Sequence, residues 1–274
     1  MTARGCALAA AALAVLSLPG GAAGRKAPPP RMTLIPAGQF WMGSPEGVGP
    51  ADEHPRHQVF LRAYYLDRHH VTAEEYAACV SRGACPAPRA GGLCNHGVAA
   101  RAKDPANCVT WEAARDYCAA QGKRLPTEAE WEKAARGGAS TKWSYGENAA
   151  ALGDYAWFSG NAGGSTRPVG LKRPNQYGLY DMGGNAWQWV WDGYDAHYYQ
   201  KSPDQDPAGP AAAANRVLRG GSRANAALSS RAAIRYWAEA GAASDTIGFR
   251  CAVPADDGTV AFSGAGRAAG RSRP

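Results

Sequence analysis

The sequence predicts an α+β fold in which long irregular loops join a few strands and helices. Apolar and polar residues alternate in 32–42 and 58–67, which is the period of strands. Helix-type spacing follows the capping residues Thr72 and Thr127. The 274 residues include 34 glycines and only 19% charged residues, which favours much irregular backbone. This length suffices for one large domain or two small ones.

Two strand regions open the domain. Residues 32–42 are predicted as a strand interrupted by a turn or bulge at 36–38. A polar loop at 47–57 follows. The alternation in 58–67 then continues as far as Val71, so we expect one long second strand.

Three helices come next. Thr72 caps the first, whose first turn carries acidic residues that suit the helix dipole, and the helix stops near Gly83. Apolar spacing predicts the second over 110–121. Thr127 and Glu130 form a capping box at the start of the third. The inner stripe of that third helix is Trp131, Ala134 and Ala135.

The stretch 177–191 is the centre of the domain. Trp187, Trp189 and Trp191 alternate, which places all three on one face of a strand and indicates core packing. The strand is entered through the glycine pair at 183–184. The alternative is a tight turn that aims oxygen atoms at a hard cation such as Ca²⁺.

The remaining segments are mostly irregular. Residues 81–106 form a loop held by cysteine bridges, and 139–178 and 192–214 show little periodicity. Strands at 216–220 and 247–253 close the core. The tail 254–274, rich in Ala, Gly, Arg and Ser, is predicted to be disordered.

The charge distribution argues against a nucleic-acid-binding protein. Of the net charge of +7, residues 1–31 carry +4 and residues 254–274 carry +1. The rest of the chain therefore carries only +2, so no basic face is expected.

The N-terminus predicts export to a periplasmic or extracellular location. Residues 1–23 have a positive end, an apolar run and a small-residue cleavage site, as a signal peptide does. The apolar run is too short for a membrane span, and 24–31 is a Pro-rich linker. Removal of the signal leaves six cysteines, which predicts three disulfides in an oxidising compartment. Spacing alone allows fifteen connectivities.

Five motifs resemble the formylglycine-generating enzyme (sulfatase-modifying factor) family. They are MTLIPAGQFWMGS at 32–44, GKRLPTEAEWEKAARGG at 122–138, GLYDMGGNAWQW at 178–189, RVLRGGS at 216–222 and IGFRCA at 247–252. The resemblance covers about 32–253 and implies one domain with the C-type-lectin-like fold of that family. It also implies a bridge between Cys118 and Cys251. The other four cysteines then pair locally, Cys79 with Cys85 and Cys94 with Cys108.

The resemblance also predicts that oxidase chemistry is absent. Formylglycine generators hold Cu(I) between two cysteines, which lie three and eight residues after the serine of RGGS. Here these positions are Asn225 and Ser230, and neither offers the soft sulfur ligand that Cu(I) selects. We therefore expect no copper and assign no catalytic residue.

Calcium is the cofactor that the resemblance does predict. The family's second calcium site corresponds to the Asp181 side chain, the carbonyls of Gly184 and Ala186, and Gln188. Gln188 stands where the family usually has Glu, which removes one negative charge and weakens the site. A first calcium site would involve Asp154 and the carbonyl of Tyr155.

A pocket is expected along the segment 223–246. The predicted pocket residues are Trp187, Ser222, Asn225, Ser230, Arg231, Arg235 and Trp237. They would offer a cation and aromatic rings to a peptide, sugar or acidic ligand. The structural alternative is that both arginines are paired with acids.

Other chemistries find no support in the sequence. His69 and His70 are neighbours on a predicted strand and would point to opposite faces, so they would not chelate a metal together. The chain contains neither HExxH nor GxSxG.

The sequence thus predicts an exported family member that binds an unknown peptide, protein or glycan ligand and carries structural calcium. The first alternative is an enzyme with altered oxidative chemistry in the same pocket. The second is a scaffold that diversifies the segment 223–246.

Overall fold

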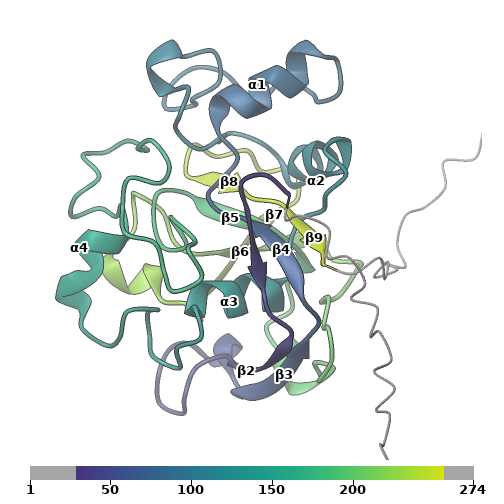
Figure 1. Cartoon of the computed structure of the whole chain (residues 1–274), viewed down its shortest axis with the longest axis vertical. Coiled ribbons are helices and arrows are strands. Elements are labelled where there is room, and N and C mark those ends of the chain that lie inside the picture. The colour runs from purple at the N-terminus through teal and green to yellow at the C-terminus, as the bar shows by residue number, and fades with distance from the viewer. Residues whose placement is uncertain (1–28, 256–274) are drawn as a thin grey trace, which may run out of the picture.

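The computed structural model describes residues 29–255, which form three small sheets and four helices in an α+β arrangement (Figure 1). The strands are β1 (Met32–Ile35), β2 (Gly38–Met42), β3 (His57–Leu61), β4 (Tyr64–Asp67), β5 (Trp187–Gly193), β6 (Asn215–Arg219), β7 (Arg235–Glu239), β8 (Ile247–Phe249) and β9 (Ala252–Pro254). The helices are α1 (Ala73–Ser81), α2 (Trp111–Ala120), α3 (Glu128–Arg136) and α4 (Leu152–Tyr155).

The N-terminal strands divide between two sheets. The turn predicted at 36–38 separates β1 from β2, and a second break separates β3 from β4. As a result β2 pairs with β3, whereas β4 lies between β1 and β9. The prediction of one long second strand was wrong, because β4 ends at Asp67 and His69 and His70 follow it outside any strand.

Two of the three longer helices begin at the predicted capping residues Thr72 and Thr127, and Thr110 caps the third. The side chain of Thr72 accepts a hydrogen bond from Glu75 N, and that of Thr110 from Ala113 N. Thr127 and Glu130 form the predicted capping box of α3, which ends at Gly137 in the left-handed conformation (φ 61°). Each cap satisfies a backbone N–H that the helix itself leaves unpaired.

The largest sheet has the order β7-β6-β5-β8, with β8 parallel to β5. Trp187 and Trp189 of β5 pack with α1, α2 and β8, and Trp191 packs at the edge of the same cluster. Val190 belongs to the other core cluster, which surrounds α3 and β1–β4. The predicted one-sided placement of the tryptophans is confirmed, and β5 separates the two cores.

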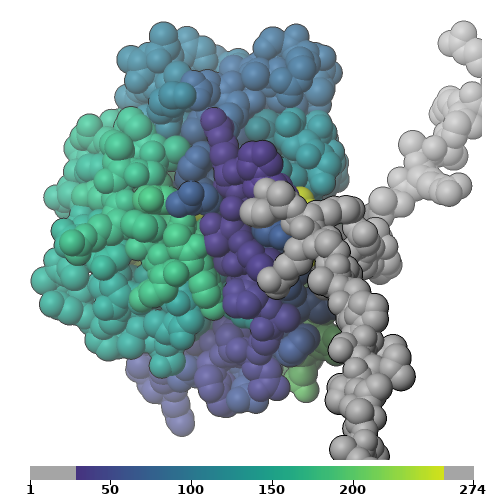
Figure 2. Space-filling model, viewed as in Figure 1, coloured from purple at the N-terminus to yellow at the C-terminus, as the bar shows by residue number. Residues whose placement is uncertain are grey.

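The three predicted disulfides are confirmed. They join Cys79 to Cys85, Cys94 to Cys108 and Cys118 to Cys251. The loops are irregular as predicted, and the teal and green segment that includes α4 forms the left flank of the molecule (Figure 2). None of the helices between residues 29 and 255 has the length and apolarity that a membrane crossing requires.

The predicted ends of the chain lie largely outside the described residues. This applies to the signal peptide at 1–23, to most of the linker at 24–31 and to nearly all of the tail at 254–274. At the C-terminal boundary, β9 includes Pro254 and runs one residue beyond the expected end of the domain.

Candidate functional site

A groove of about 390 Å³ lies beside β7 at the edge of the largest sheet. Its polar lining residues are Ser222, Asn225, Ser229, Ser244, Thr246 and Arg235, and its apolar ones include Trp187, Leu218, Ile234, Tyr236 and Ile247. The ring of Tyr236 stacks on Trp187 with centroids 5.3 Å apart, and Tyr236 is 55% exposed. The groove therefore presents one accessible aromatic ring among hydroxyl groups.

The charge in the groove is already neutralised. Arg235 is buried, and its guanidinium donates to both carboxylate oxygens of Glu128 at 2.7 and 3.0 Å. Arg231 lies outside the groove lining. Its guanidinium forms a bidentate pair with the carboxylate of Glu53, at 2.7 and 2.8 Å. Both arginines thus have the geometry of the structural alternative. The groove residues suit a neutral ligand better than an acidic one.

Asn225 closes the turn that follows the glycine pair of RGGS. Its Oδ1 accepts hydrogen bonds from the backbone N of Ser222 at 3.1 Å and from Ser222 Oγ at 2.6 Å. The serine and the asparagine therefore satisfy each other at the groove wall, which is the local side-chain-to-backbone bonding typical of such residues.

Ser230 does not share the groove with Asn225. It lines a second, smaller cavity of about 40 Å³ together with Asp181, Trp143 and Tyr145. Polar atoms of these four side chains find no hydrogen-bond partner within the described part of the chain. The two residues at the cysteine positions thus face different cavities. Trp237, also predicted for the pocket, packs against Tyr194 instead, with centroids 5.9 Å apart.

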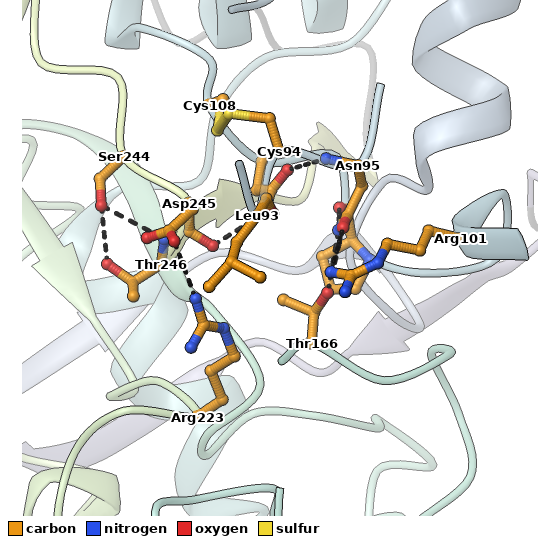
Figure 3. Close-up of a disulfide and its surroundings, with 12 residues drawn as sticks. Leu93, Cys94, Asn95, Arg101, Cys108, Thr166, Arg223, Ser244, Asp245 and Thr246 are labelled. Atoms are coloured by element: carbon orange, nitrogen blue, oxygen red, sulfur yellow. Dashed lines mark hydrogen bonds and ion pairs between the residues drawn. A yellow bond between two sulfur atoms is a disulfide. The ribbon is translucent and has the colours of Figure 1, made fainter. Parts of the chain in front are cut away.

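A disulfide loop holds the rim of the groove (Figure 3). Asn107, next to Cys108, donates from Nδ2 to the carbonyls of Leu93 and Asp245 at 3.0 and 2.8 Å. Arg223 donates to Asp245 Oδ2 at 3.0 Å and to the carbonyl of Gly164 at 2.8 Å. These bonds fix the backbone on either side of Ser244 and Thr246, which bond to each other across 2.9 Å.

A buried ionic network joins β6 and β7 to α3. Nothing in the sequence pattern predicted this network. Arg219 is fully buried and donates to Glu132 at 2.6 Å and to Glu128 at 3.1 Å. Arg136 donates to the second oxygen of Glu132 at 2.7 and 2.9 Å. Burial alone would raise the pKa of Glu132, but Arg136 and Arg219 outweigh burial and lower it. The carboxylate of Glu132 therefore stays charged within the core.

Two of the four groups predicted to bind calcium in the central turn accept hydrogen bonds from protein side chains. His70 Nε2 lies 3.0 Å from the carbonyl of Ala186. The side-chain oxygen of Gln188 accepts from Trp131 Nε1 at 2.9 Å and from Arg250 Nε at 2.6 Å. Two of the four predicted ligands are thus already satisfied. This donor set does not fit a calcium ion, which needs six to eight free oxygens.

The turn itself has the close packing that the glycine pair implies. Gly184 has φ +75°, and a Cβ there would collide with the carbonyl of Trp157. Asp181 is buried with φ 51°, and its Oδ2 accepts from Gly170 N at 2.7 Å. Burial raises the pKa of Asp181 and outweighs the bond from Gly170 and the nearby charge of Arg250.

The other calcium site was predicted at the Asp154 side chain and the carbonyl of Tyr155. The exposed Asp154 side chain lies 3.7 Å from Arg173, and the ring of Tyr155 stacks on Tyr145 with centroids 4.3 Å apart. In residues 29–255 no cluster of three His, Cys, Asp or Glu side chains has a metal-binding arrangement. Calcium at Asp154 stays a prediction.

The motifs and the fold together agree with one family of known proteins. A family model described as the sulfatase-modifying factor enzyme 1-like domain matches residues 20–255. The chain belongs to this family. The predicted membership and the predicted fold of the family, which is C-type-lectin-like, are both confirmed.

Relatives in the sulfatase-modifying factor family carry different names. The serine/threonine-protein kinase pkn1 of Chlamydia caviae is 36% identical over 241 residues, which cover 81% of this chain but only 37% of that protein. The formylglycine-generating enzyme of Streptomyces coelicolor is 34% identical, with 81% of this chain and 88% of the relative covered. The inactive Cα-formylglycine-generating enzyme 2 of Bos taurus is 38% identical over 64% of this chain and 55% of its own length.

Solved structures show the same architecture. Treponema denticola variable protein 1 superposes with a TM-score of 0.70 at 29% identity, covering 81% of this chain and 94% of the other. The fold of this chain is therefore a shared scaffold, and the side chains placed on it decide what each member does.

Proposed function

We propose that this protein is an exported binding module of the sulfatase-modifying factor family that does not oxidise cysteine to formylglycine. The observation that carries the proposal is the pair Asn225 and Ser230 at the cysteine positions, which lie on different cavities. Cu(I) requires soft ligands such as thiolates. The six cysteines within residues 29–255 are all disulfide-bonded, so none of them supplies a thiolate.

The groove beside β7 supports the binding part of the proposal. A stacked aromatic pair and several hydroxyl groups surround about 390 Å³, a volume suited to a small ligand or to one segment of a larger one. Because Arg235 is paired with Glu128, the ligand we propose is uncharged where it contacts the groove. Neutral glycans and apolar peptide segments both meet this requirement.

Export is supported by the three disulfides, which persist in oxidising compartments. The name of the inactive bovine relative shows that loss of activity occurs among proteins similar to this chain. The proposed module does not depend on calcium in the central turn, because the oxygens of Ala186 and Gln188 are engaged by other groups.

The oxidase part is tested with copper, dioxygen and a peptide containing the sulfatase motif Cys-x-Pro-x-Arg. The Streptomyces coelicolor formylglycine-generating enzyme serves as the positive control. We expect no aldehyde from this protein by mass spectrometry. Aldehyde formation at a rate comparable to the control would refute the proposal.

The binding part is tested on arrays of neutral glycans and of peptides. Tyr236→Ala removes the accessible ring of the groove, and we expect it to abolish the signals that the wild type gives. Trp41→Ala is the matched control, because Trp41 is 46% exposed on β2 and lies outside the groove lining. Signals that survive Tyr236→Ala unchanged would show that the groove is not the binding site.

A further inference from the structure

Arg250 lies against the turn where the sequence predicted calcium, and it contacts one of the four predicted ligand groups, the side chain of Gln188. The residue is fully buried, and its guanidinium is surrounded by oxygen atoms. Nε donates to the side-chain oxygen of Gln188 at 2.6 Å, and Nη1 donates to the carbonyl of Asp67 at 3.1 Å. Nη2 donates to the carbonyls of Tyr180 and Asp181 at 2.9 and 3.1 Å.

This set of contacts has the chemistry of a cation site. Three backbone carbonyls and one amide oxygen are the neutral oxygen ligands that calcium accepts in proteins. A guanidinium carries a permanent positive charge and spreads five N–H donors in a plane, so it satisfies several oxygens at once. Its position is fixed by the chain, because Cys251, the next residue, is bridged to Cys118.

Two further side chains, His70 and Trp131, donate hydrogen bonds to oxygens of the turn. His70 Nε2 contacts the carbonyl of Ala186, and Trp131 Nε1 contacts the same oxygen of Gln188 that Arg250 uses. Three segments that lie far apart in the sequence therefore converge on one turn. Each supplies a hydrogen-bond donor to an oxygen that a metal ion would otherwise coordinate.

The geometry points to a turn held by a built-in cation: Arg250, assisted by His70 and Trp131, does for residues 180–188 what a bound calcium ion would do. The protein consequently folds and stays folded without calcium. A calcium ion that used the side-chain oxygen of Gln188 would share this ligand with the guanidinium. The two like charges would repel each other strongly in so buried a place.

Among the predicted ligand atoms, the unpaired side-chain oxygen of Asp181 has a simpler explanation than a metal. Asp181 Oδ1 has no hydrogen-bond partner in the described part of the chain and borders the cavity of about 40 Å³. That cavity has room for roughly three water molecules. Ser230, Trp143 and Tyr145 supply the further polar groups that ordered water would bond.

The first test uses the wild-type protein, purified without added calcium. Thermal unfolding followed by tryptophan fluorescence is compared in a calcium chelator and in millimolar calcium. We expect Tm values within about 1 °C of each other, because a calcium site at a hundredfold excess over its Kd would raise Tm by roughly 5–10 °C. We also expect elemental analysis to find no stoichiometric calcium.

The second test removes the cation. Arg250→Gln keeps an amide donor but loses the charge, and we expect its Tm to fall by about 10 °C. Arg68→Gln is the matched control, because Arg68 is exposed over the ring of Tyr180 and its loss changes the net charge equally. We expect this control to stay within about 2 °C of the wild type.

Three results would overturn the inference. They are calcium retained at one ion per chain in the purified wild type, a wild-type Tm that drops by several degrees in chelator, and an Arg250→Gln protein as stable as Arg68→Gln. If Arg250→Gln does not fold, the two wild-type measurements still decide the question.

Discussion

At the scale of single residues, the stability of the groove depends on buried charges that satisfy one another. Glu132 accepts from Arg219 and Arg136, and also from the backbone N of Gly43 at 2.9 Å. Such pairs add little net stability when complete, because burying both charges is costly. Breaking one, however, leaves an uncompensated charge in the core. The network therefore fixes the position of β6 against α3 more than it adds stability.

Glu132→Gln tests this network. We expect a loss of about 3–5 kcal/mol in the free energy of unfolding, because Arg219 and Arg136 lose the charge that compensates them. Urea denaturation measures the loss. Glu147→Gln removes the same charge from an exposed pair with Lys142 at 3.4 Å, and we expect it to cost less than about 1 kcal/mol. Equal losses in the two variants would contradict the role of the network.

Lys133 gives the stability a pH dependence. Burial lowers the pKa of Lys133 to about 8, and its Nζ donates to the carbonyls of Pro36 and Gly38 at 2.8 Å each. In the unfolded chain the pKa is about 10.4. Between these values the folded protein has released the proton and the unfolded chain still holds it. The contribution of this group to stability therefore rises as pH rises from 8 to about 10.

Lys133→Met removes the titrating group and keeps the length of the side chain. We expect the difference in unfolding free energy, wild type minus variant, to increase between pH 8 and 10 and to be level at lower pH. Urea denaturation at a series of pH values measures it. Parallel pH profiles for the two proteins would show that Lys133 is not titrating in this range.

At the scale of elements, the helix starts were predictable and the surroundings of the helices were not. The capping residues Thr72 and Thr127 act over three residues, so the sequence alone reveals them. The inner stripe of α3 was also predicted correctly. The helix is nevertheless buried on all sides, including its acidic residues, because β6 and β7 bring arginines to it.

In the candidate site, too, local features were predictable and contacts between distant segments were not. The groove wall at Ser222 and Asn225 was predicted from a motif within a few residues. The role of His70 was missed, because its contact with Ala186 spans 116 residues and the local alternation placed it in a strand. Arg250 belongs to the recognised IGFRCA motif, yet the motif says nothing about which oxygens surround its guanidinium. Contacts between distant segments are what the periodicity of a sequence does not record.

Thr127→Ala measures what one cap contributes to α3. The Oγ1 of Thr127 accepts from Glu130 N at 3.2 Å, and Glu130 in turn accepts from Thr127 N at 2.8 Å. We expect a loss of about 1 kcal/mol in the free energy of unfolding. Thr127→Ser keeps the hydroxyl and should recover most of it. A Ser variant as unstable as the Ala variant would show that the methyl packing of Thr127 matters more than the cap.

At the scale of the whole molecule, few regular elements hold long loops in place, and covalent links take over part of that task. The core around α1, α2 and β8 contains four of the bridged cysteines, Cys79, Cys85, Cys118 and Cys251. The three bridges close segments of very different length, with separations of 6, 14 and 133 residues. The longest connects α2 to Cys251, between β8 and β9, so it joins two segments that are 133 residues apart.

The lengths of these segments predict an order of stabilisation. If a bridge acts mainly by restricting the unfolded chain, its contribution grows with the logarithm of the loop it closes. Removal of the bridges by paired Cys→Ala substitution should then cost about 2 kcal/mol for Cys79–Cys85, about 3 for Cys94–Cys108 and about 5 for Cys118–Cys251. Denaturation of the three double variants measures this order. The Cys94–Cys108 variant should in addition lose hydrogen-exchange protection around Ser244–Thr246. The reason is that Asn107, next to Cys108, donates a hydrogen bond to the carbonyl of Asp245 at the rim of the groove. A reversed order would mean that contacts in the folded state, and not the entropy of the unfolded chain, determine what each bridge contributes.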